Sequence, residues 1–147
     1  MDFGKSMKAA TIPAVLLIAL GIVGVGIGFI PFLGCITGIP MLLAGWAILG
    51  WAGFKAVKEE NLDIVGGALA GLIAGLASSL VVGVINFVLG MLGIAAVAAM
   101  GSSDITGAAL GGGLAIVGLV IGIVVGAVIG LVFGAIGALV AQQMAKK

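Results

Sequence analysis

The sequence contains no histidine, arginine or tyrosine, and its only cysteine is Cys35. A single cysteine excludes an internal disulfide framework and a multi-cysteine metal site. No serine in the chain has an obvious neighbouring base that would activate it as a nucleophile. We therefore predict a protein that is not an enzyme and has no catalytic residue, metal ligand or cofactor. Cys35 is expected to act as a small hydrophobic side chain.

Charged residues make up only 7% of the chain, whereas hydrophobic residues make up 63%. A soluble domain typically has about 25% charged residues, so the soluble class is set aside. The formal net charge of +1 leaves no basic field to hold nucleic acid. Uncharged apolar runs longer than about 18 residues are typical of transmembrane helices, and the chain has several. These features predict an integral membrane protein whose immediate partners are membrane lipids, with no nucleic-acid partner.

The apolar runs predict an all-α fold, an integral membrane helical bundle with four transmembrane helices in a single domain, residues 1–147. Proline is favoured in the first turn of a helix, where its missing N–H costs nothing. We therefore expect Pro13 near the start of the first span and Pro40 at the start of the second, with an apolar turn over Leu33–Gly38 between them. The expected spans cover about residues 11–32, 39–57, 64–90 and 112–141.

Two runs, Ile64–Met100 and Ile105–Ala145, contain no charged residue and no proline. As helices they would be about 55 and 60 Å long, well beyond the roughly 30 Å of a hydrocarbon core. Each must tilt, protrude or break into two spans. Breaks in both runs, the first near Asn86, would give six spans, which is the rival to the four that we favour.

The lysines determine the expected topology, because lysine-bearing loops stay in the cytoplasm. With an even number of spans, both termini and the polar loop Lys55–Asp63 lie on one side together with all the lysines. We therefore predict a multi-pass protein of the cell membrane with both termini cytoplasmic. Ser102, Ser103 and Asp104 are expected to cap the last helix rather than to line a pore mouth.

Small residues recur at every fourth position in two of the predicted spans. In lipid the helix keeps its backbone hydrogen bonds despite the glycines, and a row of small residues lets a second helix approach closely. The sequence leaves open whether the two rows pack on each other or on other subunits, and we lean toward a homo-oligomer. The first row is Gly67, Gly71, Gly75, Ser79 and Gly83, and the second is Gly118, Gly122, Gly126, Gly130 and Gly134.

Polar side chains within the spans are few. Asn86 is the one amide inside a predicted span, where it either bonds across helices or marks a break that lines a cavity. The hydroxyls of Ser78 and Ser79 are expected to bond their own helix backbone. If the protein has a polar path through the membrane, these three residues line it.

The stretch Pro31–Leu76 resembles a group of small prokaryotic multi-span membrane proteins of unknown function. In that group a turn with proline and cysteine precedes a glycine-rich span, a short polar loop and a G-A-x-x-G-x-x-x-G helix. Members often carry a second cysteine and a GDGA-like turn, whereas this chain has Cys35 alone and reads Asp-Ile-Val-Gly-Gly from Asp63. The resemblance implies a multi-span membrane protein and no particular activity.

Two functions follow from these observations. The first is a non-enzymatic polytopic membrane protein that acts through close helix packing, as a homo-oligomer or as an accessory subunit of a larger membrane complex. The second is a small channel or transporter, because glycine-interrupted helices form transport sites in membrane proteins.

Overall fold

The computed structural model describes residues 3–28, 31–99 and 105–145, and within these the side chains of residues 3–27, 36–92 and 116–145. The described chain forms helices α1 (Phe3–Gly28), α2 (Pro31–Glu60), α3 (Ile64–Ala99) and α4 (Ile105–Ala145). Each helix contains a segment long and apolar enough to cross a membrane. The predicted four-helix, all-α fold is confirmed.

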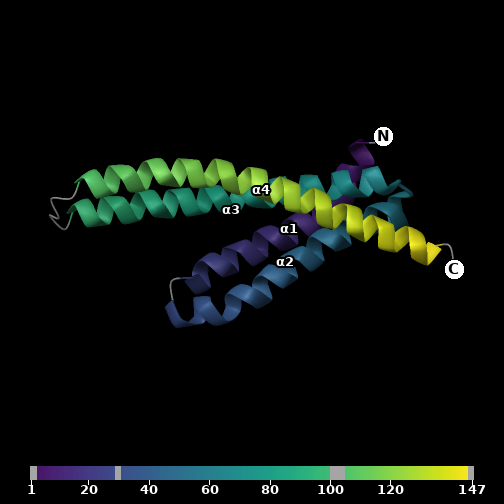
Figure 1. Ribbon diagram of the computed structural model, residues 1–147, viewed down its shortest axis with the longest axis horizontal. Coiled ribbons are helices and arrows are strands. Elements are labelled where there is room, and N and C mark those ends of the chain that lie inside the picture. Colours follow the sequence, from purple (N-terminus) through teal and green to yellow (C-terminus); the bar gives the residue numbers. More distant parts are fainter. Residues whose placement is uncertain (1–2, 29–30, 100–104, 146–147) are drawn as a thin grey trace.

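The four helices form two antiparallel hairpins, α1–α2 and α3–α4 (Figure 1). The hairpins meet where α1 begins, where α2 passes into α3 and where α4 ends. Toward their opposite ends the two hairpins diverge, as the left side of Figure 1 shows. The polar residues at the junction of α2 and α3 therefore lie at the same end of the molecule as the beginning of α1 and the end of α4.

The long apolar runs do not break, so the six-span alternative is wrong. The helix α3 has 36 residues and passes through Asn86 without interruption, and α4 has 41 residues. Neither helix contains proline, the residue that most often kinks a helix, and in lipid intrahelical hydrogen bonds are the only available partners for the backbone. At about 60 Å, α4 extends past the hydrocarbon layer or tilts strongly within it.

The first two helices begin earlier than expected. The helix α1 starts at Phe3 because the lysines, alanines and methionine that follow are strong helix formers, so Pro13 lies inside the helix and is fully buried. The turn expected over Leu33–Gly38 is also wrong, since α2 starts at Pro31 and Pro40 lies within it. Pro31 occupies the first helical position, where a proline has no N–H to lose.

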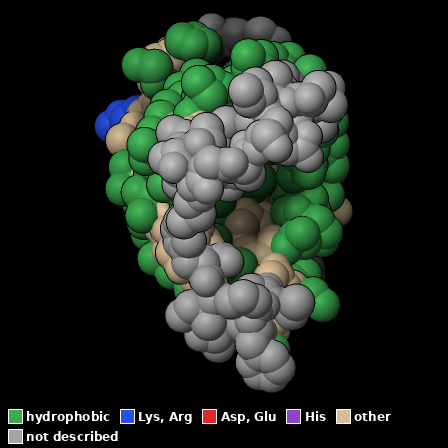
Figure 2. All heavy atoms as spheres, turned by 90° about the vertical axis from the view of Figure 1, so that its left-hand side faces the viewer, with side chains coloured by type: hydrophobic (Ala, Val, Ile, Leu, Met, Phe, Trp, Pro, Cys, Tyr) green, Lys and Arg blue, Asp and Glu red, His purple; other side chains and the backbone are tan. Residues whose placement is uncertain are grey.

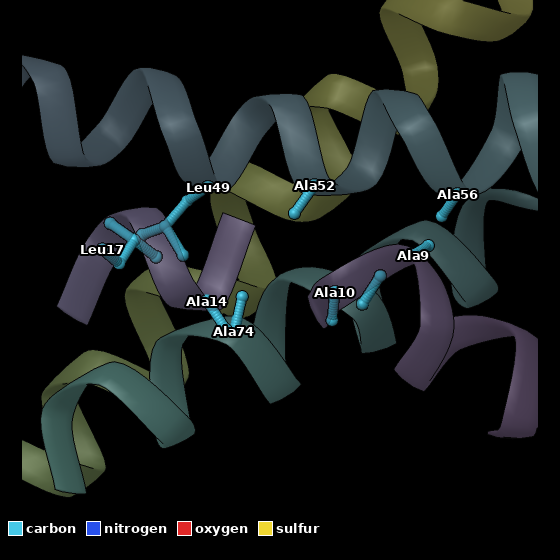
Figure 3. Packing of buried hydrophobic residues seen from close by; sticks show 9 residues of the cluster. Ala9, Ala10, Ala14, Leu17, Leu49, Ala52, Ala56 and Ala74 are labelled. Carbon is cyan, nitrogen blue, oxygen red and sulfur yellow. The ribbon is translucent and has the colours of Figure 1, made fainter. Parts of the chain in front are cut away.

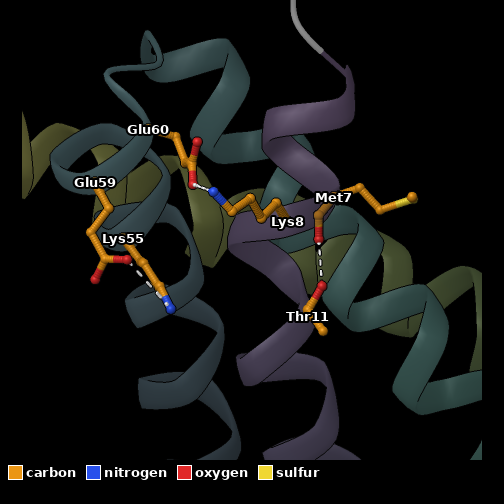
Figure 4. A network of polar contacts seen from close by, with 6 residues as sticks. All are labelled: Met7, Lys8, Thr11, Lys55, Glu59 and Glu60. Atoms are coloured by element: carbon orange, nitrogen blue, oxygen red, sulfur yellow. Dashed lines mark hydrogen bonds and ion pairs between the residues drawn. The ribbon is translucent and has the colours of Figure 1, made fainter.

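The polar stretch that begins at Lys55 is mostly helix rather than the expected loop. It forms the last turns of α2, where Lys55 Nζ lies 3.4 Å from a carboxylate oxygen of Glu59. One turn of α1 is tied to the same region, because Lys8 Nζ lies 3.3 Å from Glu60 Oε1 (Figure 4). Two lysines at this end thus pair with glutamates, one pair within α2 and the other between α1 and α2.

The connection between α2 and α3 is short and well capped. Asn61 takes the left-handed conformation, with φ of 53°, which ends α2. The Leu62 N–H then donates to the Ala56 carbonyl at 3.2 Å. Asp63 Oδ1 accepts a hydrogen bond of 2.9 Å from the Gly66 N–H, which makes Asp63 the N-cap of α3. These local bonds turn the chain through three residues so that α3 runs back beside α2.

The buried core consists mainly of alanine. Ala9 and Ala56 lie close together where α1 meets α2, and Ala14 lies beside Ala74 where α1 meets α3 (Figure 3). Leu17 is among the few large side chains in this cluster, whereas most described valine, isoleucine and leucine side chains are half-buried or exposed. Soluble proteins bury their large apolar residues. The reverse arrangement suits a protein whose outer surface faces lipid and whose helices associate through small residues.

The alanine core generates a prediction about stability. Ala10 is 1% exposed, so Ala10→Leu forces α1 away from its neighbours and should lower the free energy of unfolding by about 1–3 kcal/mol. Ala19 lies on the same helix but is exposed, so Ala19→Leu should leave stability nearly unchanged. Unfolding of both variants in mixed detergent micelles, followed by circular dichroism, measures the difference. Equal stabilities would contradict close packing at Ala10.

Candidate helix-packing site and intramembrane grooves

The two rows of small residues meet along the inner halves of α3 and α4, which are the halves nearer the α2–α3 connection. Gly71 lies directly against the Gly130 carbonyl and the Gly134 backbone. A methyl group placed on Gly134 would lie 2.8 Å from Gly71 Cα, closer than real Cβ contacts come. The two backbones therefore touch with no side chain between them, as small-residue packing in membranes allows.

The same antiparallel register continues on both sides of this contact. Toward the α2–α3 connection, Gly67 faces Ala138 of α4. Toward the diverging ends, Gly75 faces the Gly126 carbonyl, and a methyl on Gly126 would lie 2.7 Å from Ser79 Cβ. The structure thus brings together Gly67, Gly71, Gly75 and Ser79 of the first row with Gly126, Gly130 and Gly134 of the second.

The outer halves of the rows do not meet. Gly118 and Gly122 are exposed, and a methyl group on either would have no described neighbour within 4 Å. A methyl group on Gly83, the last member of the first row, would meet the Leu119 side chain at 3.7 Å and no other described residue within 4 Å. The close contact between α3 and α4 therefore ends beyond Gly126, and the second row runs on as an open strip.

A second backbone contact, between α2 and α4, was not predicted from the sequence. Gly53 lies against the Gly134 backbone, and a methyl on Gly137 would lie 3.1 Å from Gly50 Cα. Gly134 is therefore pressed by α3 on one side and by α2 on the other. The available signal was the shared three-residue spacing of Gly50–Gly53 and Gly134–Gly137, which places each pair on one helix face.

Asn86 lies between two grooves at the diverging ends of the hairpins. One groove, of about 450 Å³, lies between α3 and α4 and is lined by Asn86, Ser79, Gly118 and Gly122 among others. The other, of about 600 Å³, lies between α1 and α3, and Asn86 shares it with Gly21. Figure 2 looks at these ends and shows a hollow with hydrophobic side chains along part of its edge.

The Asn86 amide is exposed and makes no hydrogen bond within the described part of the chain. The serines differ from it in this respect. Ser78 Oγ donates to the Gly75 carbonyl and Ser79 Oγ to the Leu76 carbonyl, each at 3.1 Å, as the sequence predicted. Ser79 lines the α3–α4 groove, whereas Ser78 is not among its lining residues. The three candidates for a polar path therefore do not all reach one groove.

The remaining sequence-based expectations concern other parts of the chain. Ser102, Ser103 and Asp104 lie outside the described residues, as does the side chain of Cys35. In the described part of the chain, no group of three or more histidine, cysteine, aspartate or glutamate side chains is arranged to hold a metal ion. The lysines and acids of the described chain lie in the first turns of α1, in the last turns of α2 and in the connection to α3, where the hairpins meet.

Together these features define the class of the chain. Four apolar helices of spanning length, with an alanine and glycine interior, fit a small polytopic membrane protein. No protein-family model matches the chain, and neither the curated proteins nor the solved structures contain a significant match.

The inner and outer glycines of the second row should respond differently to the same substitution. Gly134→Ala inserts a methyl group between touching backbones and should lower the free energy of unfolding by about 1–3 kcal/mol. Gly122→Ala meets no described neighbour and should change it by less than about 0.5 kcal/mol. Unfolding is measured at a ratio of protein to micelles low enough that each micelle holds one chain. A larger effect at Gly122 would show that the register is incorrect.

Proposed function

We propose that the protein is a non-enzymatic polytopic membrane protein that acts through close helix packing, and that it assembles with further copies of itself. The observation that carries this proposal is the Asn86 amide, which is exposed and without a hydrogen-bond partner in the described chain. Beside it lie the two open glycines of the second row, Gly118 and Gly122.

An unpaired amide is unfavourable in hydrocarbon, where no water replaces the missing partner. A carboxamide carries both donors and an acceptor, so two copies of Asn86 can bond each other across a two-fold axis. Hydrogen bonds of this kind between membrane helices contribute about 1–2 kcal/mol in model peptides. The exposed strip at Gly118 and Gly122 provides the close approach that such a pair of amides requires.

The orientation and setting of the protein belong to the same proposal. The described lysines lie in the first turns of α1 and the last turns of α2, and these helix ends lie where the hairpins meet (Figure 1). This position supports a cytoplasmic location for both termini. The resemblance of Pro31–Leu76 to small prokaryotic membrane proteins supports the cell membrane as its location. A role as an accessory subunit would use the same open strip to contact a different membrane protein.

A small channel or transporter is the second candidate. It is favoured by the position of Asn86, which lines both the groove between α3 and α4 and the groove between α1 and α3. The bonding of the Ser78 and Ser79 hydroxyls to their own helix weakens this alternative.

Self-association is tested by energy transfer between labelled copies of the full chain in lipid vesicles. Gly122→Leu fills the open strip, and Asn86→Leu removes the amide pair, so each should lower the association constant about tenfold, the effect of 1.4 kcal/mol. Val124→Leu is the matched control, since Val124 is 57% exposed and lies about 200° around α4 from Gly122. Association unaffected by either change would refute self-assembly at this strip.

The same vesicles separate the second candidate from the first. If wild-type protein increases the flux of potassium or glycerol and Asn86→Leu abolishes it while association persists, the transport function replaces the packing function. Flux equal to that of protein-free vesicles leaves packing as the function.

A further inference from the structure

A third groove lies between α2 and α4. It shares no lining residue with the two grooves at Asn86. It has a volume of about 520 Å³ and is lined by aromatic and aliphatic side chains. Trp46 and Phe133 stack within it, with ring centroids 5.1 Å apart and an angle of 18° between the ring planes. Gly50 and Gly137, where the two backbones touch, also line it. Because these glycines have no side chains, only backbone lines the groove at this helix contact.

One end of this groove carries positive charge. One face of α2 carries Trp51 and the residues three, four and seven positions after it, which are Phe54, Lys55 and Lys58. Lys55 Nζ lies 5.7 Å from the centroid of the Trp51 ring, and Lys58 Nζ lies 5.4 Å from that of Phe54. Since both rings line the groove, the two ammonium groups lie at its edge.

The carboxylates nearby do not neutralise both lysines. Glu59 pairs with Lys55, and Glu60 pairs with Lys8 of α1. In the described part of the chain no carboxylate oxygen lies within 4.0 Å of Lys58 Nζ, and the Lys58 side chain is exposed. An uncompensated positive charge therefore stands where the apolar groove reaches the polar end of α2.

We propose that this groove binds an anionic phospholipid, with an acyl chain against the stacked rings and the phosphate at Lys58. The distance along α2 from Trp46 to Lys58 is about 18 Å, slightly more than the roughly 15 Å of hydrocarbon in one leaflet. The groove therefore matches one lipid in length as well as in polarity. Lys58 at the headgroup level completes the match, since basic side chains there attract anionic lipids.

The chain contains two tryptophans, and both line this groove, so their fluorescence reports directly on its occupant. Full-length protein is reconstituted in mixtures of phosphatidylglycerol and phosphatidylcholine in which either lipid carries brominated acyl chains. Bromine quenches tryptophan on contact. We expect the brominated anionic lipid to quench more strongly at equal mole fraction, corresponding to an apparent binding preference of about fivefold for one lysine at the membrane surface.

The lysine variants identify the source of the preference. Lys58→Ala should reduce the preference to about one, and Lys58→Arg should retain it because the positive charge remains. Lys5→Ala removes the same charge from the same end of the molecule, but on α1, which contributes no residue to the groove. It should therefore leave the preference unchanged. In 1 M salt the preference should fall, because screening then acts over about 3 Å.

A second variant tests the apolar part of the site. Ala47 is exposed and lines the groove, so Ala47→Phe should occupy it and bring quenching by both brominated lipids to the same, lower value. Circular dichroism checks that the helices persist in each variant. Equal quenching by the two lipids in the wild-type protein would overturn the proposal, as would a preference that survives Lys58→Ala or disappears in Lys5→Ala.

Discussion

Direct contact between helix backbones is the interaction on which this structure depends. Gly134 is the clearest case, because Gly71 of α3 and Gly53 of α2 both press against its backbone. In water each glycine destabilises a helix by about 1 kcal/mol relative to alanine. In lipid the backbone has no water to bond, so the helix persists and the glycine surface becomes available for packing. Burial of large apolar side chains is then unnecessary, and alanine fills most of the core.

The points at which this backbone contact ends determine where the open glycines and the grooves of the protein lie. The inner halves of α3 and α4 touch as far as Gly126, and beyond it the open glycines of α4 face no described neighbour. Two grooves appear where the hairpins diverge, and Asn86 lies at both. At the other end, the contact between Gly50 and Gly137 brings α2 and α4 together while their aromatic side chains leave a third groove. The proposed oligomer contact and the proposed lipid site therefore follow from the same packing.

The sequence allowed the helix count and part of the packing to be predicted. The absence of proline from the two long runs favoured four spans over six, and the fourfold spacing of small residues located the faces that α3 and α4 use. The helix starts were less predictable, because Pro13 marks the first turn of a helix only if the preceding residues are not helical themselves. The contact between α2 and α4 was missed, although it involves Gly50, Gly53 and Gly137. A single pair of glycines three residues apart does not stand out in a chain with 28 glycines.

The sequence by itself determined that the chain is a set of apolar helices with small residues along particular faces, because composition and helical period are local properties. Only the tertiary structure decided which rows meet, that Gly67 to Ser79 pack on Gly126 to Gly134, and that Gly118 and Gly122 stay open. It likewise placed Trp46 against Phe133 and left Asn86 without a described partner. These outcomes depend on the crossing and divergence of the helices, which result from all the contacts along two hairpins together and are not encoded in any single segment.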